Sequence, residues 1–436
     1  MKYESVAVIN GRVVGHMGQA AGKYVLRYEH AWRYADGAFP LSLSLPLTRE
    51  EHGDDAVRPY LANLLPDNDA VLRAWARRYQ VSANNPLALL AHVGEECPGA
   101  LQLLPPERAD ELLAREGREP DVVEWLSEDE VGARLRRVLE EPSAGRQPGD
   151  PGQFSLAGAQ PKIALLFDGT RWGIPSGRTP TTHILKPPAQ RGFDGFAENE
   201  HVCLQLAARL GLPAVRSEVR SFGGQKAFVV ERYDRVRRGD GWLRLHQEDF
   251  CQALGTPPYH KYESDGGPMA HDVVRLLAER SAEPDEDVAT MVGALALNWA
   301  LAGTDAHAKN YSHLMQPGGL IRLAPLYDVV SLLPYTESRG PRTKLAMSIG
   351  GEYRMRSIER RHWERLADSI GAERSALVEL VADVVERIPD TLRAVCGEAT
   401  DQGLGHPVLL RLQQEVGKHV SACRSALRRS GLSREN

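Results

Sequence analysis

The chain has 436 residues, which is too long for one compact core, so two or three domains are expected. Hydrophobic residues make up 42% and charged residues 25%, with a net charge of −5, which argues against a disordered chain and a wholly basic surface. No apolar stretch approaches the ~20 residues of a membrane helix, and the first residues lack the apolar core of a signal peptide. Five scattered cysteines without CxxC pairs argue against zinc sites and disulfides and favour a cytoplasmic protein.

The first half of the chain alternates between strand and helix patterns. Apolar and polar residues alternate over 5–17 and 22–29, which predicts strands joined by turns. The period becomes helical over 54–79, where the Pro66-Asp67 pair is predicted to separate two helices. Another amphipathic helix is predicted over 121–141.

A stretch rich in proline and glycine, residues 141–153, is predicted to be a flexible join. Strand patterns follow it, then a helix over 199–212, and then two more strands ending near residue 235. Beyond about residue 245 almost everything has a helical pattern. A β-rich half followed by an α-rich half predicts an α+β protein of two lobes.

The segment "TDAHAKN" ends an apolar helical run with charged and amide side chains. Asp305 and Asn310 are five residues apart, and Asp328 follows in "LYDVVS". Phosphoryl transfer needs a carboxylate that orients the acceptor hydroxyl, and it needs oxygen ligands for Mg²⁺. Protein kinases supply these with an Asp and an Asn at the same spacing and a second Asp downstream. The alternative is that Asp305 and Asn310 only cap helices, and an isolated Asp-x₄-Asn favours that alternative.

Residues upstream fit the remaining parts of a kinase, in the expected order. Lys186 near the end of a strand could contact ATP phosphates, and Glu200 in the next helix could pair with it. The alternatives are a solvent-facing lysine and an acid favoured by the helix dipole. "SLAGAQPK" is neither a Walker motif nor GxGxxG, but its amides and Lys162 could cover phosphates. Main-chain groups of Glu231 to Tyr233 in "VVERYDR" could contact adenine.

These blocks together resemble the HipA-type serine/threonine kinases, the toxins of type II toxin–antitoxin pairs. The matching blocks, in chain order, are "YLANLLPDN", "FSLAGAQPKIALL", "PTTHILKPP", "NEHVCLQLAARLGL", "VVERYDR", "QEDFCQALG", "KYESDGGP", "TDAHAKNYS", "LYDVVS" and "KLAMSIGG". The resemblance spans nearly the whole chain. It implies a two-lobed kinase-like fold with an extra N-terminal subdomain and an all-α C-terminal lobe.

The resemblance also implies a role for individual residues. It gives Asp305 as the catalytic aspartate, Asn310 and Asp328 as Mg²⁺ ligands, and Ser155 as an inhibitory autophosphorylation site. The residues that it implies for ATP binding are Ala157, Gly158, Ala159, Gln160, Pro161, Lys162, Lys186, Glu231, Arg232, Tyr233, His307 and Tyr327. The loop that follows Ser155 is short and consists largely of Ala and Gly, so few side-chain contacts are expected to hold it in place. Pro161 and Ala306 depart from the residues frequent in the family, and an alanine at 306 indicates that φ need not be positive there.

The predicted organisation is an N-terminal subdomain (1–140), the join (141–153), a kinase N-lobe (154–235) and a helical C-lobe (236–436). The resemblance implies a kinase that uses Mg²⁺ and ATP, phosphorylates a bacterial protein, for instance of the translation machinery, and causes growth arrest or persistence. It implies a HipB-like helix-turn-helix antitoxin that brings the protein to operator DNA at the nucleoid, and no membrane partner. Two alternatives stay open, a catalytically silent co-repressor and a small-molecule kinase, although intact Asp305, Asn310, Asp328 and Lys186 argue against silence.

Overall fold

The computed structural model describes residues 3–114, 122–145, 150, 154–188, 192–239, 241–335 and 343–429. Of the predicted join, residues 146–149 and 151–153 lie outside the described residues. The chain divides into two compact units, each built from three segments. The N-terminal unit consists of Met1–Pro187, Arg220–Pro258 and His313–Leu320, and the helical unit of Pro188–Val219, Tyr259–Ser312 and Ile321–Asn436.

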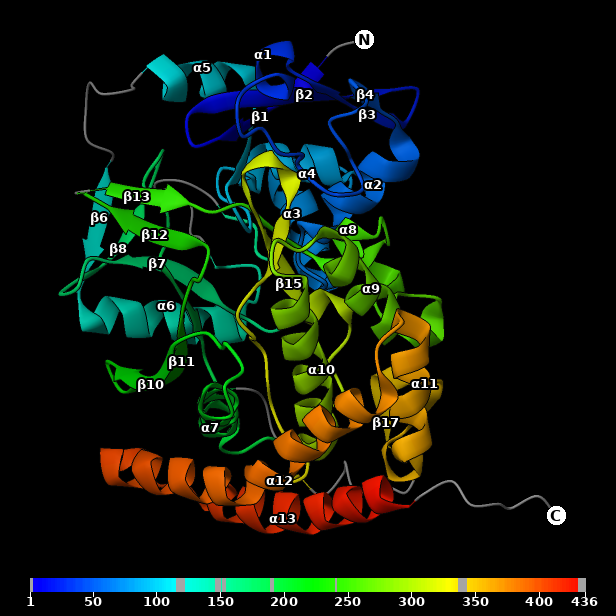
Figure 1. The fold of residues 1–436 in the computed structure, drawn as a ribbon. Helices are drawn as coiled ribbons and strands as arrows, with labels where there is room; N and C mark the ends of the chain where they lie inside the picture. The colour runs from blue at the N-terminus through cyan, green and yellow to red at the C-terminus, as the bar shows by residue number, and fades with distance from the viewer. Residues whose placement is uncertain are drawn as a thin grey trace. The chain divides into compact units, whose positions relative to one another are not determined.

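The N-terminal unit begins with a five-stranded antiparallel sheet in the order β4-β3-β2-β1-β5 (Figure 1). Its strands are β1 (Tyr3–Ile9), β2 (Arg12–Ala20), β3 (Lys23–Tyr28), β4 (Glu51–His52) and β5 (Leu101–Leu104). The alternating pattern thus predicted the first strands correctly. β1 and β2 are joined by Asn10-Gly11, both with positive φ, as a two-residue hairpin turn requires. The helices that complete its core are α2 (Asp54–Asn63), α3 (Asp69–Tyr79) and α4 (Pro86–Val93).

A second sheet of six strands runs in the order β10-β11-β9-β7-β8-β6. Its strands are β6 (Val123–Leu126), β7 (Ile163–Phe167), β8 (Trp172–Pro175), β9 (His183–Lys186), β10 (Ser217–Phe222) and β11 (Gln225–Glu231). Helix α6 (Glu128–Glu140) buries Val131, Leu135 and Val138 in the core of this sheet. The predicted helix over 121–141 is therefore wrong at its start. Ser127 begins the helix with a capping box to Glu130, and the residues before it pair with β8 as β6.

The helical unit is built around α10 (Pro284–Leu301), which is buried from Met291 to Leu301. An apolar run of this kind is typical of a helix that is covered on all sides. The helices that pack in this unit are α7 (Phe196–Arg209), α9 (Ala270–Arg280), α11 (Arg360–Ile370), α12 (Arg374–Ala399) and α13 (Pro407–Arg428). α12 and α13 lie side by side (Figure 1).

The expectation of an all-α C-terminal lobe needs a correction, because β17 (Lys344–Ile349) and β18 (Glu352–Arg354) form a hairpin there. Helices nevertheless dominate the region. The remaining elements are α1 (His30–Arg33), α5 (Pro106–Ala114), α8 (Phe250–Ala253), β12 (Arg235–Arg238), β13 (Gly241–Arg244), β14 (Gln247–Asp249), β15 (Ser312–Met315) and β16 (Ile321–Leu323), with short turns of 3₁₀ and π helix.

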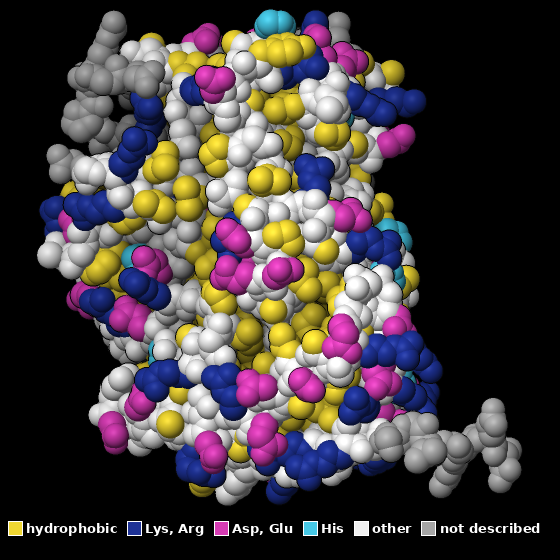
Figure 2. Space-filling model, in the orientation of Figure 1, with side chains coloured by type: hydrophobic (Ala, Val, Ile, Leu, Met, Phe, Trp, Pro, Cys, Tyr) yellow, Lys and Arg dark blue, Asp and Glu magenta, His cyan; other side chains and the backbone are white. Residues whose placement is uncertain are grey.

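Charges of both signs are interspersed over α12 and α13 on the face shown in Figure 2. Several of them form exposed ion pairs, such as Arg387 with Asp383 and Arg424 with Glu386. Exposed pairs of this kind contribute about 0–1 kcal/mol each, so this face is a solvated charged surface. Within the described part of the chain, no helix combines the length and the apolar character that crossing a membrane requires.

Candidate active site

The loop after α10 holds Asp305 and Asn310 together. Helix α10 ends at Leu301, and the capping residue Ala302, with a φ of +54°, turns the chain out of the helix. The next residue, Gly303, has no room for a side chain, since a Cβ would lie 2.2 Å from the Asn298 amide oxygen. Asn310 donates its amide N–H to the main-chain oxygen of Asp305 at 2.7 Å. The Asp305 carboxylate itself is exposed to solvent.

Tyr327 and Asp328 are tied to the same loop. The Tyr327 hydroxyl donates to the main-chain oxygen of Lys309 at 3.0 Å and lies 2.6 Å from the Ser312 hydroxyl. Asp328 is exposed and has a φ of +52°. A left-handed backbone is uncommon outside glycine and tends to occur at functional sites. Among the described non-glycine residues only five have positive φ, and Ala306 is not one of them, in agreement with the expectation that its φ need not be positive.

His307 lies two residues after Asp305 in the same loop. It is buried, and its ring meets that of Tyr262 edge-on, with 5.0 Å between the ring centres. The Tyr262 hydroxyl donates to Oδ1 of Asp305 at 2.6 Å. Tyr262 is part of the quoted block "KYESDGGP", but no role was predicted for it. The helical unit therefore brings together Asp305, Asn310, His307, Tyr327 and Asp328, and it adds Tyr262.

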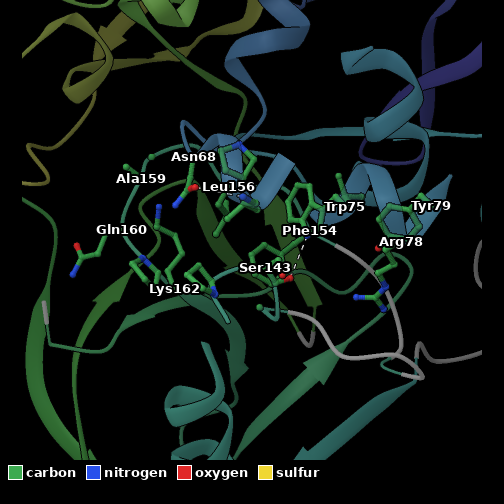
Figure 3. Close-up of a pocket in the computed structure, with 17 residues that line it drawn as sticks. Asn68, Trp75, Arg78, Tyr79, Ser143, Phe154, Leu156, Ala159, Gln160 and Lys162 are labelled. Atoms are coloured by element: carbon green, nitrogen blue, oxygen red, sulfur yellow. Dashed lines mark hydrogen bonds between the residues drawn. The ribbon is translucent and has the colours of Figure 1, made fainter. Parts of the chain in front are cut away.

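The predicted phosphate loop, residues 157–162, belongs to the N-terminal unit, and a hydrogen bond joins its first and last residues. Lys162 donates from Nζ to the main-chain oxygen of Ala157 at 2.7 Å. Gly158 has a φ of +100°, and a Cβ there would lie 2.8 Å from Lys162 Nζ, so glycine suits this position on both counts. The loop and helix α3 line a pocket in which Trp75 and Tyr79 lie at one end and Gln160 and Lys162 at the other (Figure 3).

Ser155, which precedes this loop, is fully buried. Its hydroxyl donates to the main-chain oxygen of Leu64 at 2.7 Å, and its N–H donates to the main-chain oxygen of Glu96 at 2.8 Å. Its neighbours Phe154 and Leu156 are buried as well and line the pocket of Figure 3. The expectation of little packing is therefore wrong where the loop begins, and the hydroxyl must leave Leu64 before it can react.

Lys186 lies in the second sheet of the N-terminal unit. Its side chain is 7% exposed, and its Nζ lies 5.5 Å from the centre of the Phe228 ring on the paired strand β11. Glu200 is buried in α7 of the helical unit. Because the two residues belong to different units, their pairing stays a prediction.

Of the predicted adenine segment, Glu231 ends β11 opposite His183, and the Tyr233 hydroxyl donates to Gln247. The N–H of Arg232 donates to the main-chain oxygen of Thr182 at 2.8 Å, so it is not available to a nucleotide. The remaining main-chain groups of the segment stay candidates for adenine contacts.

The Arg232 side chain takes part in a buried ionic cluster, which we define as Glu96, Arg232, Asp234 and Arg235. Arg232 contacts Glu96 at 2.8 Å and Asp234 at 2.8 Å, while Arg235 contacts the same carboxylates, each at 3.1 Å. Thr181 donates its hydroxyl to Glu96 at 2.7 Å. Burial alone would raise the pKa of Glu96, but the guanidinium groups of Arg232, Arg235 and Arg244 and the Thr181 hydrogen bond lower it to about 2. Sequence reasoning missed this cluster, because Glu96 lies 136 positions before Arg232 in the chain.

Two family models match the sequence, the HipA N-terminal domain over residues 6–104 and the HipA-like C-terminal domain over residues 154–392. The second match alone spans more than half of the chain. The chain belongs to the HipA family of serine/threonine kinases. The family resemblance read from the sequence is thus confirmed.

Relatives of this HipA-family chain cover most of its length. A putative kinase of Sinorhizobium fredii is 37% identical over 91% of this chain and 94% of its own. The serine/threonine-protein kinase toxin HipA of Shewanella oneidensis is 29% identical over 86% of this chain and 84% of its own. Among solved structures, Shewanella oneidensis HipA in complex with HipB and operator DNA matches with a TM-score of 0.80 and 25% identity, over 97% of both chains. The expected kinase-like fold is confirmed over nearly the whole chain.

Proposed function

We propose that this HipA-family kinase transfers the γ-phosphoryl group of ATP to a serine or threonine hydroxyl of a bacterial protein. The observation that supports this best is the exposed Asp305 carboxylate, held on a loop that is fixed by Asn310. Asp305 accepts the hydrogen bond of the acceptor hydroxyl and orients its oxygen toward the phosphorus. Lys186 and the 157–162 loop bind the phosphates, and the main-chain groups of Glu231 to Tyr233 other than the Arg232 N–H contact adenine. His307 and Tyr327 line the nucleotide site.

Asn310 and Asp328 fit the needs of a magnesium ion. The Asn310 amide nitrogen is used by Asp305, so its oxygen is the atom left to act as a ligand. Asp328 offers an exposed carboxylate. No cluster of three or more His, Cys, Asp or Glu side chains suited to a metal occurs in the described ranges, and Mg²⁺ does not require one, since waters and phosphates complete its shell. When bound, the ion neutralises charge on the phosphates.

The activity can be tested directly. Purified protein is added with Mg·ATP to a bacterial lysate, and phosphoserine and phosphothreonine are mapped by mass spectrometry. New phosphosites on proteins, absent when the Asp305→Asn variant is added, are the expected result. Phosphate on metabolites with none on proteins would instead favour a small-molecule kinase.

Lys186→Ala is expected to raise the KM for ATP and to slow transfer. The variant loses a positive charge that would otherwise lie on the α- and β-phosphates. Steady-state kinetics with varied ATP measure the change. Lys226→Ala, an exposed lysine on β11, serves as the matched control and should behave as wild type. If Lys186→Ala used ATP as well as the control, the role proposed for Lys186 would be wrong.

Ser155 is expected to become phosphorylated by the kinase itself, with loss of ATP binding. A phosphate adds about −1.5 to −2 charges and cannot remain where the hydroxyl now donates to Leu64. Its charge next to Lys162 would also draw that lysine away from the nucleotide. Intact-mass analysis after incubation with Mg·ATP should show one phosphate that is absent in Ser155→Ala. A phosphorylated protein with full ATP affinity would contradict the inhibitory role.

The biological role that we propose is that of a toxin. The relative from Shewanella oneidensis carries that name, and its structure was determined with HipB and operator DNA. We expect a small helix-turn-helix antitoxin to bind this chain and to recruit it to operator DNA, and the free kinase to arrest growth. Expression of wild type should stop growth, whereas Asp305→Asn should not. Equal operator repression with equal growth for both would favour the silent co-repressor.

A further inference from the structure

Close main-chain contacts fix the segment 259–268, which contains the block "KYESDGGP". This segment carries the side chain of Tyr262. Gly267 approaches His260 so closely that a Cβ would lie 1.9 Å from the His260 main-chain oxygen, and Gly266 has a φ of +86°. The N–H groups of Asp265 and Gly267 both donate to the main-chain oxygen of Tyr262 at 3.0 Å. The main-chain oxygen of Tyr262 is therefore held by two donors.

The residue after the tyrosine anchors the segment to β17. Glu263 is buried, and its carboxylate accepts two hydrogen bonds from Ser348, from the N–H at 2.6 Å and from the hydroxyl at 2.8 Å. A carboxylate held by two donors is a firm attachment point. Glu263, Ser348 and Asp305 all lie in the helical unit. The Tyr262 hydroxyl and the Asp305 carboxylate are therefore held within the same unit.

The Tyr262 hydroxyl donates a hydrogen bond to only one of the two carboxylate oxygens of Asp305. Tyr262 donates to Oδ1 at 2.6 Å, while no described residue donates to Oδ2. A carboxylate at the end of an exposed side chain would otherwise rotate about χ2. The hydrogen bond, with the His307 ring packed against the Tyr262 ring, restricts that rotation.

We propose that Tyr262 is a positioning residue, which holds the Asp305 carboxylate so that Oδ2 faces the acceptor hydroxyl. This inference rests on the proposed kinase function and extends it to a residue outside the ATP- and metal-binding sets. The close approach of Gly267 to His260 and the Glu263 anchor fix the segment that carries the Tyr262 hydroxyl.

The test compares Tyr262→Phe with Tyr259→Phe. Tyr259 lies in the same segment and is 74% exposed, so its hydroxyl is a matched control. Tyr262→Phe should lower kcat for phosphorylation of the protein acceptor by about tenfold to a hundredfold, because misplaced reacting groups cost that much. The KM for ATP and the unfolding midpoint should stay at the wild-type values, and Tyr259→Phe should match wild type throughout. Ser348→Ala, which loosens the anchor, should lower kcat in the same direction and by less.

Three results would overturn the inference. One is a Tyr262→Phe kcat within about twofold of wild type, too small a change for a positioning role. Another is a raised KM for ATP at unchanged kcat, which would assign Tyr262 to nucleotide binding. The third is phosphate on Tyr262 in a peptide map, since the phenol would then be an acceptor. A wild-type protein without any transfer would instead refute the proposed function, so the two failures are distinguishable.

Discussion

Replacing Asp305 by asparagine is expected to abolish phosphoryl transfer without disturbing the fold. The substitution keeps the size of the side chain and removes the charge that orients the acceptor hydroxyl, so activity should fall by at least about a hundredfold. The main-chain oxygen that binds Asn310 is retained, and the side chain is exposed, so the loop should keep its shape. Transfer of labelled γ-phosphate to a lysate protein, measured with the unfolding midpoint, checks both expectations.

Asp285→Asn provides the control, because Asp285 is an exposed aspartate on the first turn of α10 in the same unit. It should transfer phosphate as wild type does. Retention of more than about a tenth of the activity in Asp305→Asn would contradict the assignment of Asp305, because loss of the orienting carboxylate should cost more.

Glu96→Gln is expected to destabilise the protein by about 3–5 kcal/mol, the usual cost of breaking a buried ion pair. In the variant, Arg232 and Arg235 stay buried, and Asp234 supplies the only carboxylate that remains in the cluster. Urea unfolding monitored by tryptophan fluorescence measures the change. Glu111→Gln removes an exposed partner of Arg108 in the same unit and should cost less than about 1 kcal/mol.

The same carboxylate makes stability depend on pH. Glu96 has a folded-state pKa of about 2, below the ordinary value of 4.5. Its contribution is therefore complete above pH 4.5 and is lost as the pH falls toward 2. The difference in stability between wild type and Glu96→Gln should shrink over that range. A difference that stays constant down to pH 2 would show that the charge of Glu96 does not stabilise the fold.

Local patterns in the sequence predicted most of the fold. Alternating residues gave the hairpins of the first sheet, and the Pro66-Asp67 pair falls between α2 and α3 as expected. The start of α6 was placed too early, because the apolar residues of β6 continue the pattern of the helix that follows. The β17–β18 hairpin was missed, since three residues of β18 are too few to show a period.

The candidate site was predictable where residues lie close in the chain. Asp305 and Asn310 share one loop, and their five-residue spacing pointed to a kinase site once the upstream blocks were considered with it. Tyr262 binds Asp305 although the two residues are 43 positions apart in the chain. A contact at that separation produces no periodic pattern in the sequence. The left-handed backbone of Asp328 could not be predicted either, because aspartate tolerates that conformation and no glycine in the sequence marks the position.

The path of the chain has a consequence for synthesis. The N-terminal unit takes its last segment from His313–Leu320, and His313 is fully buried there against Phe250. Met315 adds a main-chain hydrogen bond to His246 at 2.8 Å. A nascent chain cannot complete this unit until about three quarters of the protein has left the ribosome, and such late closure slows folding. Asp328 emerges only after that segment, so a chain whose translation stops before residue 313 lacks both a finished N-terminal unit and this aspartate.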